Sequence, residues 1–137
     1  MTRYLALLRG VNVGGKGMLK MSDLKVAIEQ AGFKNVQTYI NSGNVLFSAA
    51  PTDTRKLAQD IHQIIHTTSQ LDVEVIVFTH DEWRLIIEAA PQWWGENKEW
   101  KHNLLILIPP YDMRAVIAAV GELKPDIEAM QPGKGVL

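Results

Sequence analysis

Hydrophobic and polar positions along the first half of the chain predict four strands separated by two helices and a tight turn. Residues 4–13 are rich in aliphatic side chains, as in a buried strand, and shorter apolar runs at residues 36–40, 45–47 and 73–78 predict three more strands. Between the first and second strands, and between the third and fourth, apolar residues recur at helical spacing instead. The predicted order is therefore β-α-β-β-α-β.

Local signals set the expected ends of the two helices. We expect Ser22 to be the N-cap of the first helix and Gly32 to end it, with Phe33 as the trailing apolar contact. The second helix is expected to begin at residues 51–52. The apolar positions of the two helices are Leu24, Ala27, Ile28 and Ala31 in the first, and Leu57, Ile61, Ile64, Ile65 and Thr68 in the second.

This order of elements predicts an α+β fold, a ferredoxin-like sandwich over residues 1–79. A right-handed crossover makes the first two strands parallel, and a hairpin at residues 41–44 reverses the third. The end of the first strand should therefore lie at the same sheet edge as that hairpin.

The second half of the chain predicts a smaller α+β subdomain, residues 80–137, packed with the first as one unit. Thr79 and Glu82 have the spacing of a capping box, which should start a helix. Residues 103–108 predict a strand buried on both faces. A further helix containing Met113 should end at Gly121, and the tail beyond it has weak periodicity.

Composition narrows the function classes. The 137-residue chain is 47% hydrophobic and contains no cysteine, which excludes disulfides, thiolate catalysis and cysteine-ligated metals and fits a cytoplasmic protein. Its longest apolar run, residues 104–108, is too short to span a membrane. The net charge of −1 argues against broad nucleic-acid binding.

Charge is nevertheless unevenly distributed. Residues 1–34 carry six basic and two acidic side chains, a net +4, and the remainder of the chain carries −5. The positive segment contains a glycine-rich loop, residues 9–17, directly after the first strand. Such loops can present backbone N–H groups and a cation to an anion.

The loop and the hairpin at the same sheet edge form the candidate site. We expect it to bind a small anionic or phosphorylated ligand, with no metal or other cofactor. Its residues are Arg9, Asn12, Gly14, Gly15, Lys16, Lys20, Asn41, Ser42 and Asn44. Tight turns also require glycine and asparagine, so a purely structural role for both segments stays open.

The loop comes within one residue of a nucleotide-binding P-loop. Gly10, Gly15 and Lys16 match the pattern, but Gly17 stands where a hydroxyl should bind magnesium. A P-loop also runs straight into its helix, whereas residues 18–21 intervene here before the expected cap. We therefore predict that the protein is not a P-loop nucleotide hydrolase.

Other candidate residues give weaker signals. His62 and His66 lie four apart on a helix, but no third metal ligand is spaced to join them. No catalytic triad can be assembled. Trp93, Trp94 and Trp100 could form an exposed platform for a ligand or partner, although packing is the favoured interpretation. An RNA-recognition module is weakly indicated, because only Tyr4 and Phe47 offer strand aromatics.

Two segments resemble a known family. Residues 4–15 resemble the opening signature of the bacterial "domain of unknown function 1697" family, and residues 36–47, preceded by Gly32-Phe33, resemble its second. The resemblance implies two successive ferredoxin-like subdomains and brings no activity or catalytic residues. Family members usually continue with further strands, so the second subdomain of this chain could have an incomplete sheet with an exposed strand edge.

Three functional hypotheses follow. The first is binding of a small anion at the candidate site. The second is a protein-interaction or self-association module that uses an exposed sheet edge or the tryptophan loop, which would make the protein a homo-oligomer. The third is an unrecognised enzyme, which would need a concave pocket holding a titratable group with a shifted pKa.

Overall fold

The computed structural model describes all 137 residues, which divide into two compact units, Met1–Trp83 (unit 1) and Arg84–Leu137 (unit 2). The helices and strands, in chain order, are β1 Thr2–Leu8, α1 Met21–Gln30, β2 Lys34–Tyr39, β3 Asn44–Ala49, α2 Thr54–Ser69, β4 Val75–Thr79, α3 His80–Glu88 and α4 Met113–Val120. No helix combines the length and the apolar character needed to cross a membrane.

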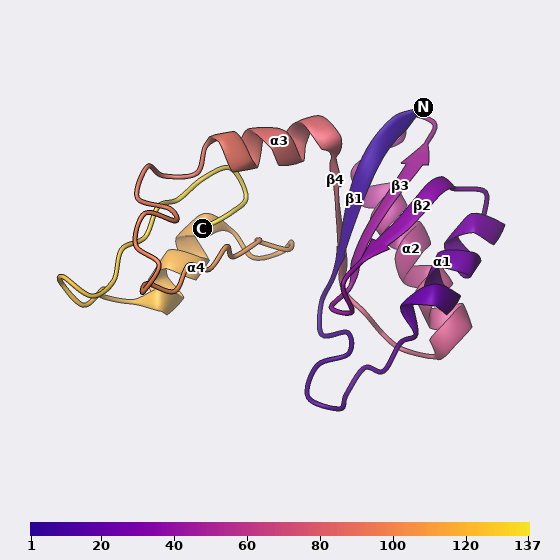
Figure 1. Ribbon diagram of the computed structural model, residues 1–137, viewed down its shortest axis with the longest axis horizontal. Coiled ribbons are helices and arrows are strands. Elements are labelled where there is room, and N and C mark those ends of the chain that lie inside the picture. The colour runs from indigo at the N-terminus through magenta and orange to yellow at the C-terminus, as the bar shows by residue number, and fades with distance from the viewer. The chain divides into compact units, whose positions relative to one another are not determined.

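Unit 1 is built on a four-stranded sheet with strand order β2-β3-β1-β4, in which every neighbouring pair is antiparallel. Helices α1 and α2 lie together on one face of this sheet (Figure 1). The predicted α+β class is thereby confirmed. Strands β1 and β2 run in the same direction with β3 between them.

Strand β1 bonds alternately to its two neighbours. The Leu8 N–H donates to the carbonyl of Gly43 at 2.9 Å, and the Arg9 N–H donates to the carbonyl of Glu74 at 3.0 Å. Because hydrogen-bonded pairs alternate along an antiparallel ladder, the even-numbered residues of β1 bond to β3 and the odd-numbered ones to β4. The even-numbered side chains from Tyr4 to Leu8 are buried, as expected for the helix-covered face.

Tyr4 anchors the core. Its ring stacks on Phe47 with a centroid distance of 5.4 Å, and Phe33 meets Phe47 edge-on at 5.2 Å. The Tyr4 hydroxyl accepts the Thr52 N–H at 3.0 Å and donates to the Thr52 carbonyl at 3.3 Å. A residue of the central strand thus fixes the segment that leads into α2.

The first strand and the first helix differ from their predicted bounds. Strand β1 ends at Leu8, not at residue 13, because Gly10 and Asn12 take φ values of 72° and 55° that turn the chain. The N-cap of α1 is Lys20, without a side-chain cap, so the prediction of Ser22 as the cap is wrong. Ser22 lies inside the first turn instead.

The second helix also begins later than residues 51–52. Thr52 is held by Tyr4, and Asp53 provides the N-cap of α2 by accepting the Arg55 N–H at 2.8 Å. Three residues of the predicted apolar face, Leu57, Ile61 and Ile65, are buried. Ile64 is partly buried, whereas Thr68 is exposed and does not belong to this face.

Two helical signals from the second half are confirmed. The Thr79 N–H donates to the Glu82 carboxylate at 2.8 Å, and the Glu82 N–H donates to the Thr79 hydroxyl at 3.1 Å. This capping box starts α3. Helix α4 is capped by Asp112, which accepts the Ala115 N–H at 2.8 Å, and Gly121 ends it.

The predicted strand at residues 103–108 is wrong. Leu105 and Leu137 exchange two backbone hydrogen bonds of 2.8 Å, and Ile106 forms an isolated bridge with Val136. Pairing from one side leaves the segment partly open, and Leu105 is 46% exposed. Unit 2 consequently has one buried residue, Val136.

Replacing Tyr4 by phenylalanine tests the anchor. Tyr4→Phe removes the acceptor of the Thr52 N–H, and we expect it to lower the free energy of unfolding by about 1–2 kcal/mol. Tyr39→Phe is the matched control, because Tyr39 is 66% exposed and its hydroxyl bonds to no other residue. Urea denaturation of both variants measures the difference, and equal losses would contradict the assigned role.

The α2 cap predicts a pH dependence. The side-chain hydrogen bond from Arg55 holds the pKa of Asp53 below its ordinary value of 3.8. A lowered folded-state pKa stabilises the fold above the ordinary pKa, and the gain is lost as pH falls through the lowered value. We expect Asp53→Asn to unfold at a lower temperature than the wild type at neutral pH. Melting curves should converge in strong acid, and a constant gap would contradict the assignment.

Candidate functional site

The glycine-rich loop folds as a miniature hairpin. The Val13 N–H donates to the Lys16 carbonyl at 3.2 Å and the Lys16 N–H donates to the Val13 carbonyl at 3.0 Å, while Gly14 and Gly15 both take positive φ. This is the pattern of a two-residue hairpin turn. A further bond joins the Asn12 N–H to the Gly17 carbonyl at 3.0 Å. Three N–H groups that a phosphate cradle would use are therefore bonded inside the loop.

Gly17 explains the missing magnesium hydroxyl. A Cβ atom at this position would lie 2.3 Å from the carbonyl oxygen of Gly10, and the glycine φ is +60°. No serine or threonine fits there unless the backbone moves. The loop thus lacks the P-loop hydroxyl because its two ends close against each other.

The side chain of Asn12 ties the loop to two other segments. Its amide nitrogen donates to the carbonyls of Leu19 and Asn41, both at 2.8 Å, and its oxygen accepts the Leu19 N–H at 2.8 Å. Asn12 therefore fastens the residue before the α1 cap and the turn after β2. The structure places the loop beside the hairpin, as the topology argument expects.

The hairpin residues serve the turn itself. Asn44 donates to the Tyr39 carbonyl at 3.1 Å and to the Ser42 hydroxyl at 3.2 Å. Gly43 approaches β1 so closely that a Cβ atom would lie 2.7 Å from that of Leu8. Asn44 and Ser42 thus have structural contacts, and the exposed Asn41 side chain accepts from the Asn12 amide at 3.4 Å.

Arg9 is directed to Glu74, the residue before β4. Its guanidinium donates to the Glu74 carboxylate at 2.9 Å, and both side chains are more than half exposed. Glu74 was missing from the predicted site, and no sequence signal identifies it, because the contact depends on the pairing of β1 with β4. The negative charge of Glu74 offsets the positive charge of Arg9.

Lys16 and Lys20 differ from Arg9 because neither forms an ion pair, and both are exposed. Lys20 directly precedes α1, whose N-terminus carries a positive partial charge and lacks a side-chain cap. We call the surface formed by Gly14, Gly15, Lys16, Lys20 and Asn41 the basic edge.

The remaining candidates lie elsewhere. His62 contacts the Val73 carbonyl at 2.6 Å through Nδ1 and Asp72 at 3.4 Å through Nε2, and no cluster of three ligands suits a metal ion. Tyr4 and Phe47 are buried, so neither can stack on a base. These side chains have structural contacts.

In unit 2, the tryptophans gather around a histidine. Trp93 stacks on His102 at a centroid distance of 6.2 Å and Trp94 lies 5.1 Å from the same ring. The Gly95 N–H approaches Nε2 of His102 at 3.2 Å. Trp100 is 51% exposed.

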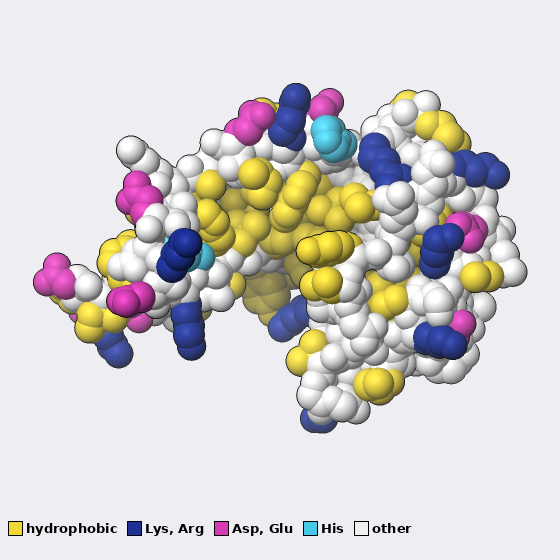
Figure 2. All heavy atoms as spheres, viewed as in Figure 1, with side chains coloured by type: hydrophobic (Ala, Val, Ile, Leu, Met, Phe, Trp, Pro, Cys, Tyr) yellow, Lys and Arg dark blue, Asp and Glu magenta, His cyan; other side chains and the backbone are white.

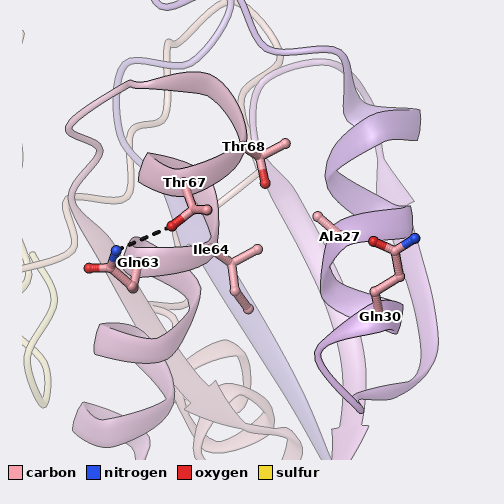
Figure 3. Close-up of a pocket in the computed structure, with 6 residues that line it drawn as sticks. All are labelled: Ala27, Gln30, Gln63, Ile64, Thr67 and Thr68. Carbon is pink, nitrogen blue, oxygen red and sulfur yellow. Dashed lines mark hydrogen bonds between the residues drawn. The ribbon is translucent and has the colours of Figure 1, made fainter.

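A shallow groove of about 250 Å³ lies between α1 and α2. Figure 3 shows its lining, in which Gln63 donates to Thr67 at 3.2 Å. The lining residues are Ala27, Gln30, Gln63, Ile64, Thr67 and Thr68. None of them is ionisable, and none belongs to the basic edge.

Asn12→Asp tests the connection made by the Asn12 side chain. The carboxylate keeps one acceptor for the Leu19 N–H but turns oxygen toward the carbonyls of Leu19 and Asn41. We expect the free energy of unfolding to fall by about 2–3 kcal/mol, because two donors are lost and like dipoles face each other. Asn41→Asp is the control, since its side-chain oxygen is already an acceptor. Chemical denaturation that ranks the two variants equally would overturn this role.

Comparison with known proteins agrees with the resemblance of residues 4–15 and 36–47. The chain is similar to the solved structure of the conserved bacterial protein SP0830 from Streptococcus pneumoniae, at 27% sequence identity and a TM-score of 0.74. That match covers 90% of this chain and 67% of the other. No curated protein matches. A family model described as "Protein of unknown function (DUF1697)" matches residues 1–137, so the chain belongs to this family, for which no activity is assigned.

Proposed function

We propose that the protein binds a small anion, such as inorganic phosphate or the phosphate group of a metabolite, at the basic edge. The observation that carries this proposal is the pair of exposed lysines without an acidic partner, Lys16 inside the closed loop and Lys20 just after it. Two such cations raise the local concentration of anions.

The closed loop supports the proposal energetically. Asn12 and the backbone bonds of residues 12–17 hold the loop in one conformation before any ligand arrives. Preorganisation lowers the entropy lost on binding. The N–H groups of Gly14 and Gly15 form no backbone hydrogen bond and remain available as donors.

The charges favour a small ligand over a nucleic acid. Because Glu74 pairs with Arg9, the basic edge offers two unpaired cations, Lys16 and Lys20. Asp23 adds a negative charge in the first turn of α1. Lys and Arg side chains are dispersed over the face of unit 1 seen in Figure 2, without a dense basic stripe. Binding of long polyanions requires many such contacts.

The basic edge lacks the groups for a reaction. It contains no carboxylate or imidazole, and the neighbouring Ser42 hydroxyl accepts from Asn44 without a base beside it. General acid–base and nucleophilic catalysis both require such a pair. We therefore propose a binding role.

We also propose that unit 1 has the ferredoxin-like fold. The β-α-β-β-α-β order and the strand order β2-β3-β1-β4, with both helices on one face, support this proposal. For residues 80–137 we propose a second, smaller α+β subdomain, supported by α4 and by the pairing of residues 105–107 with 135–137.

A cytoplasmic location is proposed on composition alone. The chain contains no cysteine and so forms no disulfide, which fits the reducing cytoplasm, where disulfides are rare.

Isothermal titration with phosphate, pyrophosphate and ADP at low ionic strength tests the anion site. We expect the double variant Lys16→Ala, Lys20→Ala to bind at least about tenfold more weakly, because each ammonium contributes to the attraction. Lys34→Ala is the matched control, since Lys34 is exposed and begins β2 at the opposite end from the loop. Added salt should weaken wild-type binding.

Two results would contradict the site. One is the absence of heat and of thermal stabilisation with all three anions. The other is equal binding by the wild type and the double variant.

A further inference from the structure

Ile40 combines two properties that the fold itself does not explain. Its φ is 50°, in the left-handed region that β-branched residues avoid, and its side chain is 62% exposed. The other non-glycine residues with positive φ are all polar, namely Asn12, Asn35, Gln70 and Asp126. Ile40 does not belong to the core, so burial does not offset the backbone strain. A strained residue whose side chain faces water indicates a role outside the fold.

Three exposed apolar side chains surround the hydrogen bonds of Asn12. We call them the apolar rim, and they are Val13, Met18 and Ile40, each more than half exposed. The Asn12 side chain bonds to Leu19 and Asn41. Each residue of the apolar rim is the direct neighbour in the chain of one of these three bonded residues. The bonds of Asn12 therefore bring together the segments that carry the apolar rim.

The apolar rim adjoins the cations of the basic edge. Val13 and Lys16 exchange two backbone hydrogen bonds, and the side chains of directly opposed residues in a hairpin project to the same side. Lys20 directly follows Leu19, which Asn12 binds. At the lower end of unit 1, Figure 2 shows hydrophobic side chains in yellow close to a Lys or Arg side chain in dark blue. This surface therefore offers apolar contact and positive charge together.

We propose that the anion bound at the basic edge is a phosphate monoester with an apolar or aromatic group, and that this group contacts the apolar rim. The inference rests on the proposed function and specifies the class of its ligand. The dianionic phosphate interacts with the ammonium groups of Lys16 and Lys20. The organic group of the ester covers Ile40, and removal of this apolar surface from water favours binding.

The charges of this region favour a small ester over an anionic lipid surface. Recognition of such a surface uses clusters of about four to eight Lys or Arg residues, whereas the basic edge has two lysines. Asp23, in the first turn of α1, and Glu74, beside Arg9, add negative charges to the same end of unit 1. An anionic surface would meet these carboxylates, and a small ester would not.

Two esters of equal charge test the ligand class. Methyl phosphate and phenyl phosphate are both dianions at mildly alkaline pH and differ in the size of the apolar group. In isothermal titration we expect the wild type to bind phenyl phosphate at least about tenfold more tightly than methyl phosphate. The double variant Lys16→Ala, Lys20→Ala should bind both esters more weakly than the wild type does.

The outcomes separate this inference from the proposed function. If the wild type binds both esters equally and the double variant binds neither as well, the anion site stands and the ligand class is wrong. If neither ester binds, both proposals fail. Binding of phenyl phosphate that does not depend on the two lysines would also overturn the ligand class.

Ile40→Asn separates the apolar contact from the charge. Asparagine tolerates a positive φ, so we expect this variant to unfold at a higher temperature than the wild type and to keep less than about a threefold preference for phenyl phosphate. Val26→Asn is the matched control, because Val26 is an exposed apolar residue of α1 outside the apolar rim, and it should keep the wild-type preference. An unchanged preference in Ile40→Asn would overturn the contact.

A lipid headgroup is the other source of an apolar phosphate ester. Sedimentation with vesicles of phosphatidylcholine containing phosphatidic acid distinguishes it from a free ester, and we expect the wild type to stay in the supernatant. Cosedimentation that disappears in Ile40→Asn would overturn the small-ligand assignment in favour of a lipid surface.

Discussion

The alternating hydrogen bonds of β1 fix the rest of unit 1. Each residue of this strand can bond to only one neighbour, so assigning Leu8 to the hairpin at Gly43 and Arg9 to Glu74 settles the phase of both ladders. The same alternation sends Tyr4, Ala6 and Leu8 under the helices. Consequently the loop leaves the sheet from a point held on both sides, and the outward groups of β4 are determined by a strand on its other flank.

The side chain of Asn12 fixes the conformation of the glycine-rich loop. A single side chain satisfies both backbone groups of Leu19 and the carbonyl of Asn41, which would otherwise lack these partners. Glycine and asparagine in the loop are explained by this closure without a ligand. This closure leaves the two lysines and the N–H groups of Gly14 and Gly15 outside the internal hydrogen bonds. The proposed anion binding depends on these groups and not on the whole motif.

Sequence analysis succeeded where the deciding contacts are local. The capping box of Thr79 and Glu82, the stop at Gly32 and the end of α4 at Gly121 each depend on residues within one turn, and their spacing in the sequence is sufficient. Asn12 binds both backbone groups of Leu19, seven residues away, and α1 begins just after Leu19 with Lys20 as its N-cap. The local capping signal of Ser22 could not reveal this contact, and it therefore predicted the wrong N-cap. The pairing of Arg9 with Glu74 spans 65 residues. Residues 103–108 have the composition of a buried strand, but composition cannot show that pairing comes from one side only.

The two edges of the sheet differ because β1 is itself polar at one end. Arg3 reaches across β3 to donate to the Asn35 carbonyl at 2.5 Å and to Gln37 at 3.2 Å, and these contacts hold the irregular part of β2. Leu5 pairs on its other side with Phe78, and Leu7 with Ile76, so the face not covered by α1 and α2 is apolar toward β4. A strand added at β2 would meet a bulge and the side chains around Arg3.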